Sequence, residues 1–189
     1  EIKVGTGFEA LGNSDDGGRR VVRLNGVNAR GQAALGEVFA AVWLVPEMDR
    51  LFMDSAGARR RFLDRLVVAF DPAHATRLND YGQAMRERTR LLRADRDGRR
   101  NADLVWVSAL EQRMAESGIA LAAERQHFVK RLGAACELAV GPFPAAGLSL
   151  IGDTESWLDQ GAALEAEDRF RAALFKSRDA DREAGRALI

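Results

Sequence analysis

Cysteine, histidine and lysine are scarce in this sequence, and long hydrophobic runs are missing. The single cysteine, Cys136, has no second cysteine with which to form a disulfide, and the two histidines, His74 and His127, lie far apart. The chain therefore has too few of the residues that usually bind zinc. No hydrophobic segment approaches the roughly 20 residues of a membrane-spanning helix, and the start has no basic segment followed by an apolar one. We expect a metal-free, cytoplasmic chain without membrane contact.

An excess of charge of one sign is also missing, because 28 basic residues are balanced by 28 acidic residues. The overall field of the chain does not attract a polyanion, so any nucleic-acid contact must come from a local cluster of basic side chains. Hydrophobic residues, by contrast, make up 47% of the 189 positions. This content is enough for one domain with a substantial core or for two small ones.

The first 45 residues have a strand-like pattern. Apolar residues alternate over residues 2–8, and a second apolar stretch at residues 21–24 leads into Asn25-Gly26, a dipeptide typical of two-residue hairpin turns. A short helix near residues 32–38 and an apolar strand over residues 40–45 are predicted to follow. The region therefore indicates a β-hairpin or meander.

The middle of the chain has helical periodicity. Ser55 is a candidate cap for a helix that reaches about residue 70, and Asp71-Pro72 is a typical start for the next helix. A polar loop at residues 95–101 separates that helix from a long one over residues 102–140, whose apolar residues recur at steps of three and four. Two long helices joined by a short loop predict an antiparallel hairpin.

The last part of the chain is predicted to contain a strand at 148–151, a helix through residues 164–174 and the start of another strand at 186–189. Together these patterns predict an α+β fold. Because the first residues read as the middle of a strand and the last ones as the start of another, we expect the chain to be an internal portion of a longer protein.

The helix after Ser55 contains charged residues in an unusual arrangement. At 100° per residue, Arg59 lies on the same face as Phe62 and Leu66. A buried guanidinium must be paired, so we expect Arg59 to meet Glu47, Asp54 or backbone carbonyls. Arg60 and Asp64 are spaced as a helical ion pair on a neighbouring face. These residues either lock the helix onto the preceding strand or couple nucleotide binding to domain movement.

A cluster of arginines marks the end of the first long helix. Residues 86–100 contain seven arginines and only three acidic residues. Such a basic tip can bind DNA phosphates with release of counterions, whereas the alternative is an ordinary solvated helix face without aromatic residues for base stacking. The candidate DNA-binding residues are Arg86, Arg88, Arg90, Arg93, Arg96, Arg99 and Arg100.

Residues 46–64 resemble the signature of the RecF family of DNA-repair ATPases. The resemblance extends to the Asn25-Gly26 turn and to the closing Ala184-Gly185-Arg186. It also covers the helix around Arg88, where the family has Arg-Asn-x-Leu-Leu and this chain has Thr89 in place of the asparagine. It departs from the family at Asp54-Ser55-Ala56, where a Gly-small-Pro turn is usual. The shared signature residues are Pro46, Glu47, Leu51, Phe52, Arg59, Arg60, Phe62, Leu63 and Asp64.

The resemblance implies an ABC-type ATPase head related to Rad50 and SMC proteins, with a short helical arm. RecF-like proteins bind ATP and magnesium, dimerise around ATP, bind gapped or double-stranded DNA and act with RecO and RecR to load RecA. On this basis residues 1–45 complete the first ATPase lobe, residues 46–140 form the arm domain, and residues 141–189 return to the head. The resemblance also makes Glu47 a candidate nucleotide sensor, and Arg59, Arg60 and Asp64 candidate coupling residues.

The chain contains no Gly-x-x-x-x-Gly-Lys-Ser/Thr phosphate loop. We therefore expect no catalytic residues in it, no binding of ATP or magnesium by this chain alone, and no ATP hydrolysis. The alternative function is a helical protein-interaction module that binds neither nucleotide nor DNA. Trp106 and Trp157 would be its natural anchors, because large aromatic residues often dominate protein interfaces.

Overall fold

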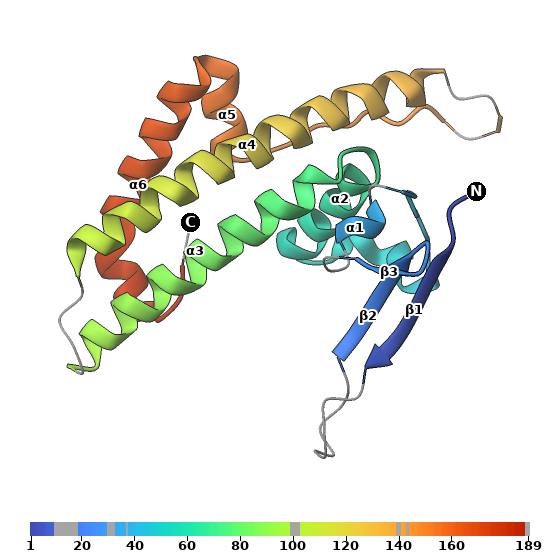
Figure 1. The fold of residues 1–189 in the computed structure, drawn as a ribbon. Coiled ribbons are helices and arrows are strands. Elements are labelled where there is room, and N and C mark those ends of the chain that lie inside the picture. The colour runs from blue at the N-terminus through green and yellow to red at the C-terminus, as the bar shows by residue number, and fades with distance from the viewer. Residues whose placement is uncertain are drawn as a thin grey trace. The chain divides into compact units, whose positions relative to one another are not determined.

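The computed structural model describes residues 1–9, 19–29, 33–36, 38–98, 103–138, 141–142 and 144–187. It divides the chain into two compact units, which we call the N-terminal unit (residues 1–75) and the helical unit (residues 76–189). The ribbon in Figure 1 shows strands and short helices in the first and long helices in the second. The predicted α+β class is confirmed. The predicted boundaries after residues 45 and 140 concern roles in a longer protein and stay predictions.

The N-terminal unit contains a small antiparallel sheet of β1 (Val4–Glu9), β2 (Arg19–Leu24) and β3 (Val27–Asn28), in the order β1-β2-β3. The register pairs Val4 with Leu24 and Arg23 with Asn28. Asn25 and Gly26 have φ angles of 52° and 85°, the left-handed values that a two-residue hairpin turn of this kind requires. The hairpin predicted from this dipeptide is confirmed.

The N-terminal unit also contains helical segments. They are α1 (Ala33–Gly36), a 3-10 helix η1 (Pro46–Met53), α2 (Ala56–Phe70) and the first turn of α3 (Ala73–Arg96). As predicted, the Ser55 hydroxyl caps α2 by accepting from the Ala58 N–H at 3.3 Å. The Asp71 carboxylate accepts from the Ala73 N–H at 3.0 Å where α3 begins.

The helical unit consists of the rest of α3, α4 (Leu104–Glu137), α5 (Asp153–Gln160) and α6 (Ala163–Ala184). Ion pairs connect Arg77 to Glu124 and Arg88 to Glu111, so a residue further along α3 meets one earlier in α4. The two helices are therefore antiparallel, as predicted (Figure 1). The core consists of buried residues of α3, α4 and α6, with Tyr81 and Trp157 packed against it. The buried residues are Ala84, Leu110, Met114, Ala115, Ile119, Ala166, Phe170 and Leu174.

Two predicted strands are wrong. Residues 40–45 and 148–151 have no strand conformation. Most of their large apolar side chains are exposed, namely Val42, Trp43, Leu44, Val45, Leu148 and Ile151. A strand needs a hydrogen-bonded neighbour, and none of the strands in the described part of the chain pairs with either segment. A third strand was predicted to start at residues 186–189. Arg186 and Ala187 are not in a strand, and residues 188–189 lie outside the described residues.

Candidate nucleic-acid interface

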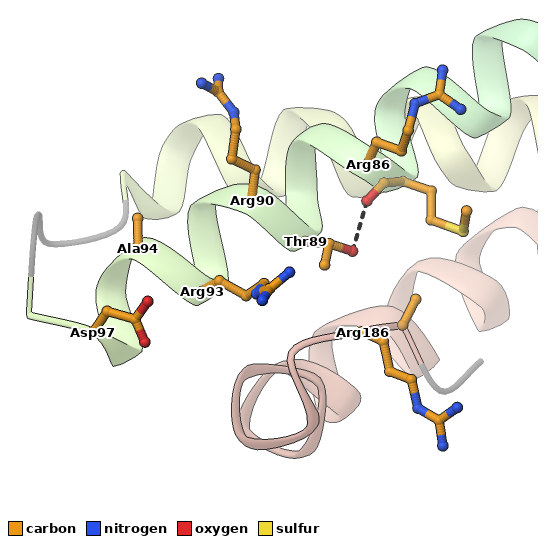
Figure 2. Close-up of a pocket in the computed structure, with 9 residues that line it drawn as sticks. Arg86, Thr89, Arg90, Arg93, Ala94, Asp97 and Arg186 are labelled. Carbon is orange, nitrogen blue, oxygen red and sulfur yellow. Dashed lines mark hydrogen bonds between the residues drawn. The ribbon is translucent and has the colours of Figure 1, made fainter.

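Arginines line an open hollow of about 680 Å³ between α3 and the residues that follow α6. Arg86, Arg90 and Arg93 recur at steps of four and three, so they lie along one face of α3, and all three are exposed. Arg186, just beyond the end of α6, contributes from the other side (Figure 2). The lining therefore contains four arginines and one acidic residue, Asp97.

The arginines of this hollow point in different directions. In Figure 2, Arg93 extends toward the end of α6, whereas Arg86 and Arg90 extend from α3 on the side away from it. Within the part of the chain that the structure describes, Arg86, Arg93 and Arg186 form no ion pair. The arrangement is an open basic surface rather than a closed pocket, which suits an extended anion better than a compact one.

Two exposed arginines of α3, Arg90 of the hollow and Arg96 beyond it, are paired with carboxylates. Arg90 Nη2 lies 2.6 Å from Glu87 Oε1, and Arg96 Nε and Nη2 each lie 2.9 Å from Asp97 Oδ1. Arg96 also donates a long hydrogen bond of 3.4 Å to the Glu183 carbonyl at the end of α6. Both pairs are solvent-exposed, so each stabilises the fold by at most about 1 kcal/mol.

Gly185 allows α6 to approach these arginines closely. It ends α6 in the left-handed conformation at φ 63°, which glycine adopts without strain. A Cβ atom there would lie 3.2 Å from Arg96 Nη1 and 3.4 Å from Arg93 Nε. The absence of a side chain at Gly185 therefore leaves room for Arg93 and Arg96 at the end of α6.

The prediction that Arg88 contacts DNA is wrong. Arg88 is 0% exposed, and its guanidinium donates to Glu111 Oε1 at 3.0 Å and to Asp181 Oδ2 at 2.5 Å. It also donates to the Leu174 carbonyl at 2.8 Å and to the Ser177 hydroxyl at 3.2 Å. Arg88 therefore joins α3, α4 and α6 inside the helical unit, and no phosphate can reach it.

A second arginine completes this buried network. Arg178 donates to both oxygens of Glu111, at 2.9 and 2.5 Å, and to the Ser108 hydroxyl at 2.8 Å. Two guanidinium groups thus face two carboxylates, Glu111 and Asp181, which are 1% and 2% exposed. We define these four residues as the buried ion network. The sequence did not single out Glu111, Asp181 or Arg178, although Glu111 lies between the buried Leu110 and Met114 on the core face of α4.

The remaining predicted DNA-binding residues, Arg99 and Arg100, lie outside the described residues. The side chain of Glu47, the predicted nucleotide sensor, is likewise not described, although its backbone belongs to η1. The roles proposed for these three residues stay predictions.

The other predicted coupling residues lie on α2, but not as expected. Arg59 is exposed rather than buried, and its Nη1 donates to the Asp54 carbonyl at 2.5 Å. The predicted burial is therefore wrong, while a backbone carbonyl is indeed its partner. Arg60 is exposed as well. Asp64 is buried, and its Oδ1 accepts a hydrogen bond from His74 Nε2 at 2.9 Å.

Replacing His74 with alanine is expected to lower the free energy of unfolding of the N-terminal unit by about 1–3 kcal/mol. His74 is 0% exposed, and its loss removes a donor from the buried Asp64 carboxylate and leaves a cavity beside α2. Hydrogen exchange of peptides from α2 is the measurement. His127→Ala on α4 is the control, and an equal loss of protection in α2 from both substitutions would contradict the prediction.

Arg65 is a further residue of α2 that the sequence did not single out. Its guanidinium carbon lies 4.5 Å from the Trp43 ring centroid and 5.2 Å from that of Phe62, and its Nη2 donates to the Met48 sulfur at 3.3 Å. Arg65 therefore connects α2 to η1 and to the segment before it, largely through cation–π contacts. The available signal was the pair of aromatic residues, Trp43 just before the 46–64 signature and Phe62 within it.

Within the described ranges, no helix is long and apolar enough to cross a membrane. No group of three or more histidine, cysteine, aspartate or glutamate side chains is placed to bind a metal ion in that same part of the chain.

Comparison with known proteins gives close relatives along the entire chain, although no family model matches it. The chain is 47% identical over 190 residues to the DNA replication and repair protein RecF of Mesorhizobium japonicum, covering 100% of this chain and 48% of that protein. It is 44% identical over 190 residues to RecF of Brucella suis biovar 1, covering 100% and 47%. The chain thus spans about half the length of the curated relatives it matches.

The fold is also similar to that of a solved protein. The structure of the recombination mediator protein RecF-ATP in the RecFOR pathway matches with a TM-score of 0.71 at 17% identity, over 91% of this chain and 46% of that one. This match shows the shared fold, and the sequence identity over the whole length of the chain shows that it belongs to the RecF family of DNA replication and repair proteins.

Proposed function

We propose that this chain is the portion of a RecF-family DNA replication and repair protein that carries the helical arm, and that the arm binds DNA through α3. The supporting observation is the row of exposed arginines Arg86, Arg90 and Arg93, with Arg186 across the hollow. Arg96 belongs to the same proposed surface, and Arg99 and Arg100, which lie outside the described residues, stay candidates from the sequence alone. Arg88 is excluded because it is buried.

The proposed contact is with the DNA backbone and not with the bases. The lining of the hollow contains no aromatic residue among those described, so it offers no platform for base stacking. Arginines contact phosphates through charge-assisted hydrogen bonds and release the counterions condensed on DNA. This mode suits gapped or double-stranded DNA of any sequence, with an affinity that falls steeply as salt rises.

In the intact family protein, the proposed partners are ATP with magnesium, RecO, RecR and a second copy of the protein in an ATP-dependent homodimer, in the cytoplasm. The sequence of this chain has no phosphate loop, so other segments would hold the nucleotide. Glu47 and the α2 residues Arg59, Arg60 and Asp64 would then relay nucleotide binding to the arm. RecA loading with RecO and RecR is part of the same proposal.

Reversing the charge of Arg86 and Arg93 tests the proposal. The double variant Arg86→Glu/Arg93→Glu is expected to bind a gapped duplex about 10–100-fold more weakly at low salt, because each change removes an arginine that binds phosphate and adds a repulsion. The dependence of log K on log salt should become shallower by about 0.9 for each phosphate that the variant no longer neutralises. Fluorescence anisotropy over a salt series measures both quantities.

A matched control is available on α6, where Arg169 and Arg171 are exposed and do not line the arginine hollow. Arg169→Glu/Arg171→Glu changes the net charge equally and is expected to bind DNA nearly as the unmodified chain does. Equal weakening by the two double variants would show that net charge alone governs binding, and would contradict the proposed surface.

The alternative, a protein-interaction module, has one specific observation in its favour. Trp106 is 51% exposed in the first turn of α4, beside the exposed Leu104 and Val105. Trp157, by contrast, packs 6.0 Å from Phe170 at the core, which argues against its role as an anchor. Retention of RecO or RecR by the chain, lost on Trp106→Ala and accompanied by no DNA binding, would favour this alternative.

A further inference from the structure

The exposed arginines of α3 fall into two groups. Arg86 and Arg93 have no acidic partner within the described part of the chain, whereas Arg90 is paired with Glu87 and Arg96 with Asp97. Glu87 and Asp97 are themselves partly exposed, with side-chain exposures of 33% and 34%. Asp97 itself lines the arginine hollow, and Glu87 is held at its edge by the pair with Arg90, which lines it too.

A carboxylate on such a surface opposes DNA binding in two ways. It accepts the guanidinium N–H groups that would otherwise bind phosphate oxygens, since both anions are recognised by the same donors. It also repels the approaching phosphates, and this repulsion is long-ranged at low salt. Exposed ion pairs are weak, so phosphates that arrive next to these arginines can displace the carboxylates.

We propose that Glu87 and Asp97 are internal competitors of DNA phosphates for Arg90 and Arg96, and that they limit the affinity of the arm surface. This inference rests on the proposed DNA-binding function. A backbone already held by Arg86 and Arg93 presents its next phosphates to Arg90 and Arg96 at high effective concentration. The ligand class that overcomes the competition is therefore a continuous polyanion, whereas an isolated phosphate has no such advantage.

The helical unit contains a third exposed pair of similar geometry. Arg171 Nη2 lies 2.8 Å from Asp168 Oδ1 on α6, three residues apart as Arg90 and Glu87 are, with side-chain exposures of 50% and 61%. Neither residue lines the arginine hollow. Asp168→Asn thus removes one negative charge and frees one arginine, as Glu87→Gln does, but at a different place on the same unit.

The experiment measures binding of the full 189-residue chain to a gapped duplex over a salt series. Glu87→Gln and Asp97→Asn are each expected to tighten binding about two- to fivefold and to steepen the salt dependence by up to about 0.9 for each additional phosphate that is neutralised. Asp168→Asn is expected to leave both quantities nearly unchanged. Inorganic phosphate, added at matched ionic strength, should compete no better than chloride against the unmodified chain.

Each result separates the two proposals. Unchanged affinity in Glu87→Gln and Asp97→Asn, while Arg86→Glu/Arg93→Glu still weakens binding about 10–100-fold, would overturn the competitor role and leave the proposed DNA surface standing. If Asp168→Asn tightens DNA binding as much as Glu87→Gln and Asp97→Asn do, net charge alone explains the effect. That result would also overturn the competitor role. If Arg86→Glu/Arg93→Glu binds DNA normally, the proposed function itself fails. Far-UV circular dichroism of each variant verifies that the helices are retained.

Discussion

Replacing Arg88 with alanine is expected to lower the free energy of unfolding of the helical unit by about 3–5 kcal/mol, because it removes the guanidinium that binds two buried carboxylates. Asp181 would lose a charged hydrogen bond of 2.5 Å, while its Oδ2 still accepts one from the Ser177 hydroxyl at 2.7 Å. Glu111 would lose its bond to Arg88 and keep Arg178. Both carboxylates therefore contribute to the expected cost.

The charge balance of the buried ion network predicts that a second substitution can offset this loss. Arg88→Met removes one positive charge, and adding Asp181→Leu removes the negative charge that it leaves behind. The remaining pair, Glu111 with Arg178, is balanced, and hydrophobic replacement of buried ion pairs is often neutral or stabilising. We expect Arg88→Met/Asp181→Leu to recover most of the stability that Arg88→Met alone loses.

The measurement is urea unfolding followed by circular dichroism, with hydrogen exchange to assign the loss to peptides of α3, α4 and α6. Arg86→Ala is the control, because it removes an exposed arginine from the same helix and should cost less than about 0.5 kcal/mol. If Arg88→Ala costs no more than Arg86→Ala, the network contributes nothing to stability. If Asp181→Leu worsens Arg88→Met, the charge argument is wrong.

Local signals in the sequence were sufficient to predict most of the helices and the hairpin turn. Ser55 and Asp71 were recognised as helix starts because their side chains accept backbone N–H groups, and the structure shows both bonds. Asn25-Gly26 was recognised because few residues tolerate two successive positive φ angles. These features depend on a few neighbouring residues, so they can be predicted without a structure.

The two strand predictions failed because strand formation depends on residues far away. The run from Ala40 to Val45 is apolar and contains two β-branched valines, which favours a strand on composition alone. Its conformation is nevertheless decided by whether another strand offers hydrogen bonds to it. In the described part of the chain none does, so the intrinsic preference is not realised.

The candidate site was predictable only in part, because neighbouring arginines on one helix meet different surroundings. Arg86, Arg88 and Arg90 look alike in sequence, yet only Arg88 lies four residues from both Ala84 and Leu92, which are buried. Helical spacing from these apolar residues was the signal that could have identified it. For α2 the same reasoning misled, since the residues it buries are Asp64 and Val67 and not Arg59.

Replacing Phe170 with alanine is expected to lower the free energy of unfolding of the helical unit by about 3–5 kcal/mol. Phe170 is 3% exposed and lies 6.5 Å from the Tyr81 ring and 6.0 Å from the Trp157 ring, so its removal leaves a cavity where α3, α5 and α6 meet α4. Phe175→Ala on the same helix is the control. Phe175 is 61% exposed, and its ring centroid lies 4.6 Å from the Arg178 guanidinium carbon, so the loss should stay below about 1 kcal/mol.

Gly118 provides a sharper test of the same packing. A Cβ atom at Gly118 would lie only 2.5 Å from Phe170 Cε1 and 3.2 Å from Tyr81 Cε2, so Gly118→Ala should destabilise the unmodified chain by about 1–3 kcal/mol. In Phe170→Ala the 2.5 Å clash is absent, and the Tyr81 ring, 3.2 Å away, can shift into the space that Phe170 leaves. Alanine is also the better helix former by about 1 kcal/mol. Gly118→Ala should therefore change sign and stabilise that background. The double-mutant cycle, measured by urea unfolding, reports this coupling directly, and additive effects of the two substitutions would show that Phe170 does not pack against Gly118 as described.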